Sequence, residues 1–274
     1  MPQKSPKQIQ VTKASGEREP FLPEKVRESI KRSGASRELA NDVLKLVEPE
    51  LYDGITTHEI YQHVFQHLRE IGTHVASKYS LKQSIMELGP SGYPFEKFLA
   101  KVMEAEGYQV AVGQKVRGKC VWHEVDVIAE KDGKKHLIEA KFHNESGLKT
   151  DTKVALYIYA RFLDASSGDG FDEGWLVTNT KLTRDARIYC ECVGLNYMSW
   201  DKPQGRSLRE TVERSGLYPV TVLTTLNRRE KSTLLGEGIV TCKDLLTNLK
   251  AIPKSKRSKV QEEAQKVCSF DNAS

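Results

Sequence analysis

The sequence predicts a multidomain fold in which a helical N-terminal part, a central α/β part and a small helical C-terminal part follow one another along 274 residues. Three observations predict this order. Apolar residues recur at helical spacing in the first third, strand and helix patterns alternate in the middle, and helical spacing returns in the last quarter. A dense turn cluster, GPSGYP at 89–94, marks the first boundary. We therefore expect domains at 1–90, 91–200 and 201–274.

The N-terminal region opens with a short strand pattern, IQVTK, and then becomes helical. The stretch EKVRESIKRSG carries Val26 and Ile30 four residues apart and is followed by Gly34, a typical helix terminator. Two further stretches, RELANDVLKLVEPEL and THEIYQHVFQHLREIG, repeat the helical period. The stretch HVASKYSLKQSIMELG predicts one more helix before the turn cluster.

The central region mixes helices with strands. Its first helix, PFEKFLAKVMEAEGY, has an apolar stripe that we expect to be buried. The stripe consists of Phe95, Phe98, Leu99, Val102 and Met103. Two strands are predicted at 121–130 and 135–142, followed by a helix, a buried strand, a second helix and a last strand within 151–200. This mixture indicates a layered α/β domain.

The two predicted strands form a hairpin with an unusual set of charges. An Asp-Gly pair at 132–133 is the favoured centre of a two-residue type I′ turn, and with that turn the numbers of cross-strand partners sum to 265. Asp126 then lies opposite Glu139, and Glu124 lies opposite Lys141. Because side chains alternate along a strand, these four residues share one face. The apolar residues that we expect on the other face are Val125, Val127, Ile138 and Ala140.

Two carboxylates directly opposite each other repel, so a hairpin built only for stability would not contain this pair. A divalent metal removes the conflict, since Mg²⁺ prefers carboxylate oxygens, activates water and stabilises charge on a phosphate. Lys141, two residues from Glu139, can orient that water or neutralise the transition state. Glu96 borders the apolar stripe of its helix and can add a further carboxylate. The alternative is an edge hairpin with an outward ladder of charges, including a Glu124–Lys141 ion pair.

The helix with Glu96 and the stretch EVDVIAEKDGKKHLIEAKF resemble the PD-(D/E)xK nuclease superfamily, and most closely its Mrr-like restriction endonucleases. The resemblance covers the central region and implies a restriction-endonuclease-like α/β/α fold. It places Asp126, Glu139 and Lys141 on the catalytic motif and Glu96 as the acid on the helix, with Mg²⁺ or Mn²⁺ held by Asp126 and Glu139. Val125 stands where the motif has its proline.

The N-terminal stretches VTKASGEREPFLPEKV, GITTHEIYQHVFQHL and ASKYSLKQ resemble the ATP cone, a small regulatory domain that binds ATP or dATP. The resemblance implies nucleotide contacts from Val11, Lys13, Lys25 and Thr57, in which the lysines meet phosphates and Thr57 offers a hydroxyl. Ala14 departs from the pattern, because the family has a basic residue there. The chain has no G-x-x-x-x-G-K-[ST] stretch, so we expect a nucleotide sensor and not a P-loop motor. The alternative is a plain helical domain with solvated lysines.

The C-terminal region carries the whole excess of positive charge. Residues 1–200 contain 28 basic and 28 acidic residues, whereas residues 201–274 contain 14 and 9. This fits an anionic partner, although a solvated basic tail gives the same count. The stretch LTTLNRREKSTLLGEGIVTCKDLL is similar to a helix-hairpin-helix element, whose backbone amides would bind phosphate. Added attraction to DNA would come from Arg228, Arg229, Lys231 and Lys243.

Together these features predict a Mg²⁺-dependent DNA endonuclease that ATP or dATP regulates, with a role in defence against foreign DNA implied by the resemblance. We expect a homodimer or higher homo-oligomer, since one site of this kind cuts one strand. The apolar runs are too short for a membrane span, and the cysteine pattern favours the cytoplasm. Two alternatives remain: a nucleotide-sensing DNA-binding regulator without nuclease activity, and a DNA repair or junction nuclease.

Overall fold

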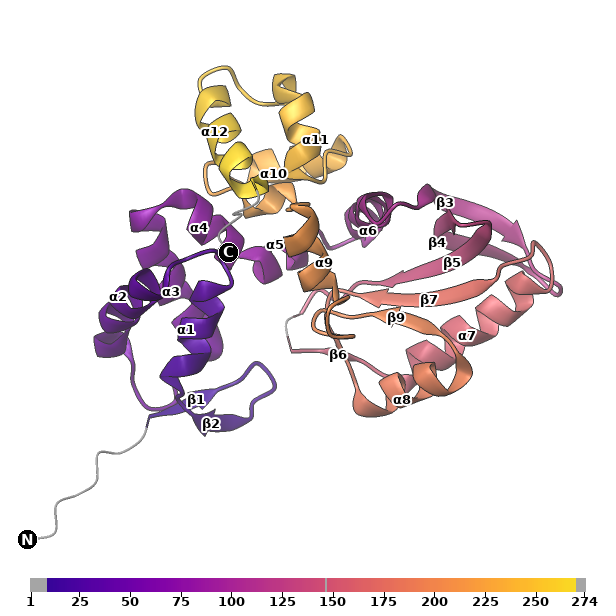
Figure 1. The fold of residues 1–274 in the computed structure, drawn as a ribbon, viewed down its shortest axis with the longest axis horizontal. Coiled ribbons are helices and arrows are strands. Elements are labelled where there is room, and N and C mark those ends of the chain that lie inside the picture. The colour runs from indigo at the N-terminus through magenta and orange to yellow at the C-terminus, as the bar shows by residue number, and fades with distance from the viewer. Residues whose placement is uncertain (1–8, 146, 270–274) are drawn as a thin grey trace, which may run out of the picture.

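The computed structural model describes residues 9–145 and 147–269, and it has three parts in the predicted order (Figure 1). The N-terminal part is helical, the central part is a five-stranded sheet between helices, and the last part is a small group of helices beside the first two parts. No helix of the described residues is long and apolar enough to cross a membrane. The first eight residues lie outside the described part.

The N-terminal part is a helical domain with a two-stranded antiparallel sheet of β1 (Gln10–Thr12) and β2 (Arg18–Pro20). Its helices are α1 (Pro23–Lys31), α2 (Arg37–Val47), α3 (Thr57–Ile71), α4 (Thr73–Tyr79) and α5 (Leu81–Met86). The prediction of a single helix over 74–89 is wrong, because the helix is interrupted at Ser80. Before the break, Val75 packs in the core of this domain, whereas Leu81 after it packs in the core shared by the other two parts.

The central sheet has the strand order β3-β4-β5-β7-β9. Neighbours β3, β4 and β5 are antiparallel, and β5, β7 and β9 are parallel. The strands are β3 (Gln109–Arg117), β4 (Trp122–Lys131), β5 (Lys134–Lys141), β7 (Glu173–Thr178) and β9 (Asn196–Met198). A second, two-stranded parallel sheet consists of β6 (Lys149–Thr150) and β8 (Lys181–Leu182). Sequence analysis missed β3, an edge strand whose mostly exposed residues give little hydrophobic signal.

Helices cover both faces of the sheet, which gives the predicted α/β/α layers. Helix α6 (Tyr93–Ala105) packs on one face, and its predicted apolar stripe is buried in the largest core. Helices α7 (Thr152–Ser166) and α8 (Arg184–Val193) pack on the other face, where their apolar residues form separate clusters. Helix α8 is capped at both ends, since Thr183 accepts a hydrogen bond from Ala186 N and Gly194 ends the helix in the left-handed region.

The C-terminal part consists of α9 (Leu208–Ser215), α10 (Arg228–Gly236), α11 (Cys242–Thr247) and α12 (Arg257–Cys268). Its buried residues join those of α6 and of the sheet in one hydrophobic cluster. Residue 200 is therefore not a boundary between two separate cores. The basic stretch at 250–260 is not a free tail, because Val260 on α12 is buried and Lys256 pairs with Glu230 at 2.8 Å.

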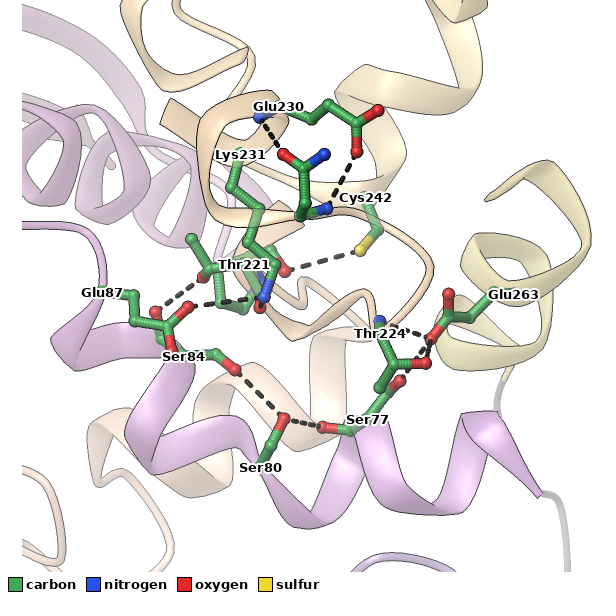
Figure 2. Close-up of polar contacts among 12 residues, drawn as sticks. Ser77, Ser80, Ser84, Glu87, Thr221, Thr224, Glu230, Lys231, Cys242 and Glu263 are labelled. Atoms are coloured by element: carbon green, nitrogen blue, oxygen red, sulfur yellow. Dashed lines mark hydrogen bonds and ion pairs between the residues drawn. The ribbon is translucent and has the colours of Figure 1, made fainter. Parts of the chain in front are cut away.

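A buried carboxylate joins the N-terminal domain to the C-terminal part (Figure 2). Glu263 on α12 is 2% exposed. Its Oε1 accepts hydrogen bonds from Ser77 Oγ of α4 at 2.8 Å and from Thr224 N and Oγ1 at 2.7 and 2.8 Å. Its Oε2 accepts from Thr225 N and Oγ1 at 3.1 and 2.6 Å. Because both oxygens accept from several donors, this buried charge is compensated and fixes α4 in place.

A second set of contacts continues the same interface along α5 (Figure 2). Thr221 Oγ1 donates to the Ser84 carbonyl at 2.6 Å, and Lys231 Nζ donates to the Thr221 carbonyl. Lys231 also lies 3.4 Å from the carboxylate of Glu87, just after α5. These bonds hold α5 against the C-terminal part.

We predict that Glu263→Gln lowers the free energy of unfolding by about 2–4 kcal/mol, because the amide group would face donors and leave them buried without an acceptor. Glu262→Gln is the matched control. Glu262 is exposed and pairs with Lys266 at 2.7 Å, so its loss should change stability by less than about 0.5 kcal/mol. Urea denaturation measures both effects, and equal stabilities of the two variants would contradict the assigned role of Glu263.

Candidate active site and nucleotide pocket

The predicted hairpin forms with the predicted register as far as Val127. Both turn residues have positive φ, 53° at Asp132 and 74° at Gly133, as a type I′ turn requires. The ladder runs from the pair Lys131–Lys134 to the pair Val127–Ile138. The next predicted pair does not continue it, because the Asp126 side chain accepts a hydrogen bond from Ala140 N at 2.7 Å. The strands therefore separate where the carboxylates lie.

At Asp126, the side chains of β4 also change from one side of the sheet to the other. Val127 and Ile138 pack in the core with α6, as predicted. Val125 is buried in a different cluster, together with Leu137, so the expectation that it shares their face is wrong. The register of β3 and β4 places Gly113 opposite Asp126, and Gly113 has φ 63° and forms no pair in the ladder. The alternation therefore breaks at Asp126, and this break could not be read from the hairpin alone.

Three of the predicted catalytic residues come together at the end of the hairpin. Glu139 is 6% exposed, and burial and then the charge of Asp126 raise its pKa to about 8. Burial, followed by the charges of Asp126 and Glu124, raises the pKa of Glu96 on α6 to about 7. Burial also raises the pKa of Asp126. The site is a partly buried group of acids in which each ionised carboxylate disfavours the ionisation of its neighbours.

Sequence analysis missed Arg161 on α7. Its Nη1 donates to Glu139 Oε2 at 2.7 Å, and its Nη2 donates to the backbone carbonyl of Glu124. The guanidinium reaches the site from the face opposite α6. The available signal was weak: one arginine within the otherwise apolar run ALYIYARFL.

Lys141 lies at the exposed end of β5, next to this acidic group. Among the described residues its side chain has no hydrogen bond or ion pair, and the Glu124–Lys141 pair of the charge-ladder alternative does not form. A free ammonium at this end of the strand can meet a phosphate group that approaches from solvent.

The acidic group fits a divalent metal. Glu139 Oε1 is buried without a hydrogen-bond partner among the described residues, and such an atom destabilises the fold unless a ligand binds it. A cation would also relieve the mutual repulsion of Glu139, Asp126 and Glu96. Among residues 9–145 and 147–269, no group of three or more His, Cys, Asp or Glu side chains is arranged to hold a metal. The ligands would be Asp126 and Glu139 with water, a coordination that suits Mg²⁺.

In the N-terminal domain, the two predicted phosphate-binding lysines meet at one carboxylate. Lys13 Nζ lies 2.8 Å from Glu19, and Lys25 Nζ lies 2.9 Å from the other oxygen of the same residue. Hydrogen bonds from these lysines, Lys13 first, lower the pKa of Glu19. A phosphate group would compete with Glu19 for both ammonium groups.

Two adjacent cavities surround these residues. The larger, of about 610 Å³, is lined by Lys13, Ala14 and Thr57 among others, and the smaller, of about 170 Å³, is lined by Val11 and Lys25. The cavities share four lining residues, Ser29, Thr57, Tyr61 and Tyr79. All four predicted nucleotide contacts therefore line this double cavity, although the Val11 side chain is mainly a core residue at 4% exposure.

The candidate DNA-contacting residues divide into two groups. Arg228 and Arg229 are exposed at the start of α10. Lys231 is held in the interface with α5, and Lys243 Nζ donates to the Ser215 carbonyl at 2.9 Å. Lys231 is therefore not placed to contact DNA.

The phosphate grip that we predicted for the GEGIV hairpin stays a prediction, although several of its backbone donors are already used. Gly238 N donates to Leu235 O at 3.1 Å, and Ile239 N donates to Leu234 O at 2.9 Å. At the start of α11, Cys242 N donates to Tyr218 O at 2.8 Å.

Comparisons with known proteins agree with this architecture. Residues 9–85 match the model of the ATP cone domain, residues 89–200 match a restriction endonuclease model, and residues 218–268 match the model described as AF1548-like, C-terminal. The chain is 38% identical to an uncharacterized protein of Archaeoglobus fulgidus over 149 residues, which are 54% of this chain and 84% of that protein.

Two solved structures are similar. The crystal structure of AF1548, a protein of unknown function, is 35% identical with a TM-score of 0.56, and the match covers 64% of this chain and 97% of that one. The MspJI restriction endonuclease in complex with a 27-mer oligonucleotide is 15% identical with a TM-score of 0.37, over 60% of this chain and 36% of that one.

The layered domain is of the restriction endonuclease type, and it is joined to an ATP cone domain. The chain belongs to the family of its A. fulgidus relative. It carries an N-terminal ATP cone domain, and its central domain matches the restriction endonuclease model.

We predict that stability without metal falls as pH rises. The folded state keeps a proton on Glu139 between its ordinary pKa of 4.5 and its raised pKa of about 8, so the unfolded state binds fewer protons in that window. In EDTA, the free energy of unfolding should fall by about 1–3 kcal/mol from pH 6 to pH 8. Mg²⁺ should restore more stability at pH 8 than at pH 6, as chemical denaturation will show.

Two variants control this measurement. Glu139→Gln should remove most of the pH dependence and of the Mg²⁺ effect, whereas Glu130→Gln, on the exposed side of the same hairpin, should retain both. Equal Mg²⁺ stabilisation in the Glu139→Gln and Glu130→Gln variants would contradict metal binding at this site.

Proposed function

We propose that this protein is a Mg²⁺-dependent DNA endonuclease that hydrolyses phosphodiester bonds and that ATP or dATP regulates by binding to its N-terminal cone. One observation carries the proposal. Asp126, Glu139 and Glu96 converge at the split end of a hairpin, with an unpartnered buried oxygen on Glu139 and Lys141 at the open edge. Burial of so much like charge is expected where a bound cation and a phosphate complete the site.

Each residue has a separate role in this proposal. Asp126 and Glu139 would hold the metal, which would lower the pKa of a bound water and polarise the phosphate. Lys141 would bind the phosphate and stabilise the charge that develops on it. Glu96 shares the acidic group and would hold or position water near it. Arg161 balances the charge of Glu139 and fixes its carboxylate through a 2.7 Å bond.

The surface beside the site suits a nucleic acid. Trp122 is 64% exposed at the start of β4, and the guanidinium of Arg117 lies 5.7 Å from the centre of its ring. Lys115 pairs across the strands with Glu124, so a basic and aromatic edge lies next to the acids. Aromatic rings that stack on bases, together with cations that meet phosphates, are a common way to bind DNA strands. Arg228 and Arg229 would add attraction that does not depend on sequence.

Defence against foreign DNA is the role we propose, on the basis of the match to the restriction endonuclease model. A double-strand break needs two such sites, so we propose that two copies act together.

We predict that Asp126→Ala and Lys141→Ala each reduce DNA nicking at least 100-fold in Mg²⁺, because one removes a metal ligand and the other the cation that stabilises the transition state. DNA affinity, measured by fluorescence anisotropy, should change less than about threefold. Lys134→Ala at the other end of β5 is the control and should keep full activity. Normal cutting by either site variant would show that the assignment is wrong.

We predict that a non-hydrolysable ATP analogue changes the nicking rate in the same direction as ATP, by about 5–150-fold, the range of ordinary allosteric coupling. Binding alone can shift an equilibrium if the two states differ in affinity, and this chain has no P-loop. Lys25→Ala should abolish the response, whereas Lys45→Ala, on an exposed part of α2, should retain it. A response to ATP without a response to the analogue would mean that hydrolysis is required.

A further inference from the structure

The larger nucleotide cavity is not confined to the cone. Its walls include Lys13, Arg32 and Lys82 from the N-terminal part and Trp200, Arg209 and Glu213 from beyond the nuclease sheet. The cavity of about 610 Å³ therefore lies between the cone and α9. The cone also approaches the nuclease domain, since a Cβ added at Gly147, just before β6, would lie 2.9 Å from the Cβ of Ala14, which lines the cavity.

Positive charge from both sides faces into this cavity. Loss of hydration, and next the charge of Arg209, lower the pKa of Arg32. Burial raises the pKa of Glu213, the carboxylate that lies near both guanidinium groups. Arg209 Nε is buried without a hydrogen bond, and the nearest Glu213 oxygen is 3.8 Å away. With Lys13 and Lys82 in the same walls, cations outnumber this one carboxylate, and a buried donor is left for an anion.

We propose that α9 completes the nucleotide site: Arg209 binds the phosphates of ATP or dATP together with the lysines of the cone, and Trp200 lies against the bound nucleotide. This inference rests on the proposed nucleotide binding and adds a second domain to it. The polyphosphate bridges Arg32 and Arg209, which otherwise repel each other. The apolar compartment beside Val11 and Phe21 takes the adenine.

This arrangement gives the nucleotide a short route to the active site. Leu208 and Val212 of α9 are buried in the same core as Phe98 of α6, and Arg214 pairs with Glu106 at the end of α6 at 2.8 Å. Helix α6 carries Glu96. A ligand that binds the cone and Arg209 together favours one position of the cone relative to α9, and α9 is packed on the helix that supplies the acid.

The test is nucleotide affinity of the full chain by isothermal titration calorimetry, with ATP and with dATP. Arg209→Gln should weaken both nucleotides at least 10-fold, by the same factor, since phosphate is common to them. Arg214→Gln, on the same helix with the same change of charge and outside the cavity, should stay within twofold of the unmodified chain. Lys13→Ala reports on the cone side and should also weaken binding.

The outcomes separate the two proposals. Normal affinity in Arg209→Gln, with weak binding in Lys13→Ala, overturns the role of α9 and leaves the cone site intact. Equal weakening in Arg209→Gln and Arg214→Gln also overturns it, because the effect then belongs to the helix as a whole. If the unmodified chain binds neither nucleotide, nucleotide regulation itself is wrong.

Fluorescence provides a second measurement that does not depend on a charge change. Trp200 is one of three tryptophans and the one in the cavity wall. Saturating ATP should change the emission of the unmodified chain, and Trp200→Phe should lose that change, whereas Trp122→Phe should keep it. A nucleotide-induced change that survives in Trp200→Phe would place the ligand away from α9.

Discussion

The burial of one charge, the Glu263 carboxylate, sets how the cone is held against the C-terminal part. Five hydrogen bonds reach its two oxygens, from Ser77 of the cone and from the Thr224–Thr225 loop. A buried carboxylate without those donors would be strongly destabilising, so the elements that provide them must stay together. The position of α4, of the α5 helix that follows it, and of the cavity between cone and α9 all depend on this contact.

The candidate active site shows the opposite case, a buried carboxylate that lacks donors. At Glu263 every acceptor site is supplied with donors, whereas Glu139 retains a buried oxygen that no described residue satisfies. Arg161 offsets one oxygen only. The repulsion among Glu139, Asp126 and Glu96 is thus maintained by packing from both faces of the sheet, through α6 on one side and α7 on the other. Such stored repulsion favours the binding of a cation.

The two sites are joined by packing and not by a linker. The turn cluster at 89–94 separates cone and nuclease in sequence, yet α5 and α9 lie in one hydrophobic cluster with α6. A change at the nucleotide cavity therefore meets a continuous core before it reaches Glu96. Because close-packed cores respond by shifting between discrete arrangements, this geometry suits a regulatory domain better than a flexible tether would.

The sequence by itself determined what local rules control. The Asp-Gly turn fixed the register of the hairpin as far as Val127, and the 3.6-residue period fixed α6 and its stripe. The predicted position of Asp126 opposite Glu139 pointed to the acidic group, although the ladder ends before that pair. Long-range contacts decided the rest. Arg161 contacts Glu139 from a helix 22 residues away in the chain. The helix predicted around Ser80 is divided, and its two halves pack in different cores. Lys231 pairs with Glu87, which lies 144 residues earlier. Only the tertiary structure brings such groups together, because their proximity follows from packing and leaves no period or spacing in the chain.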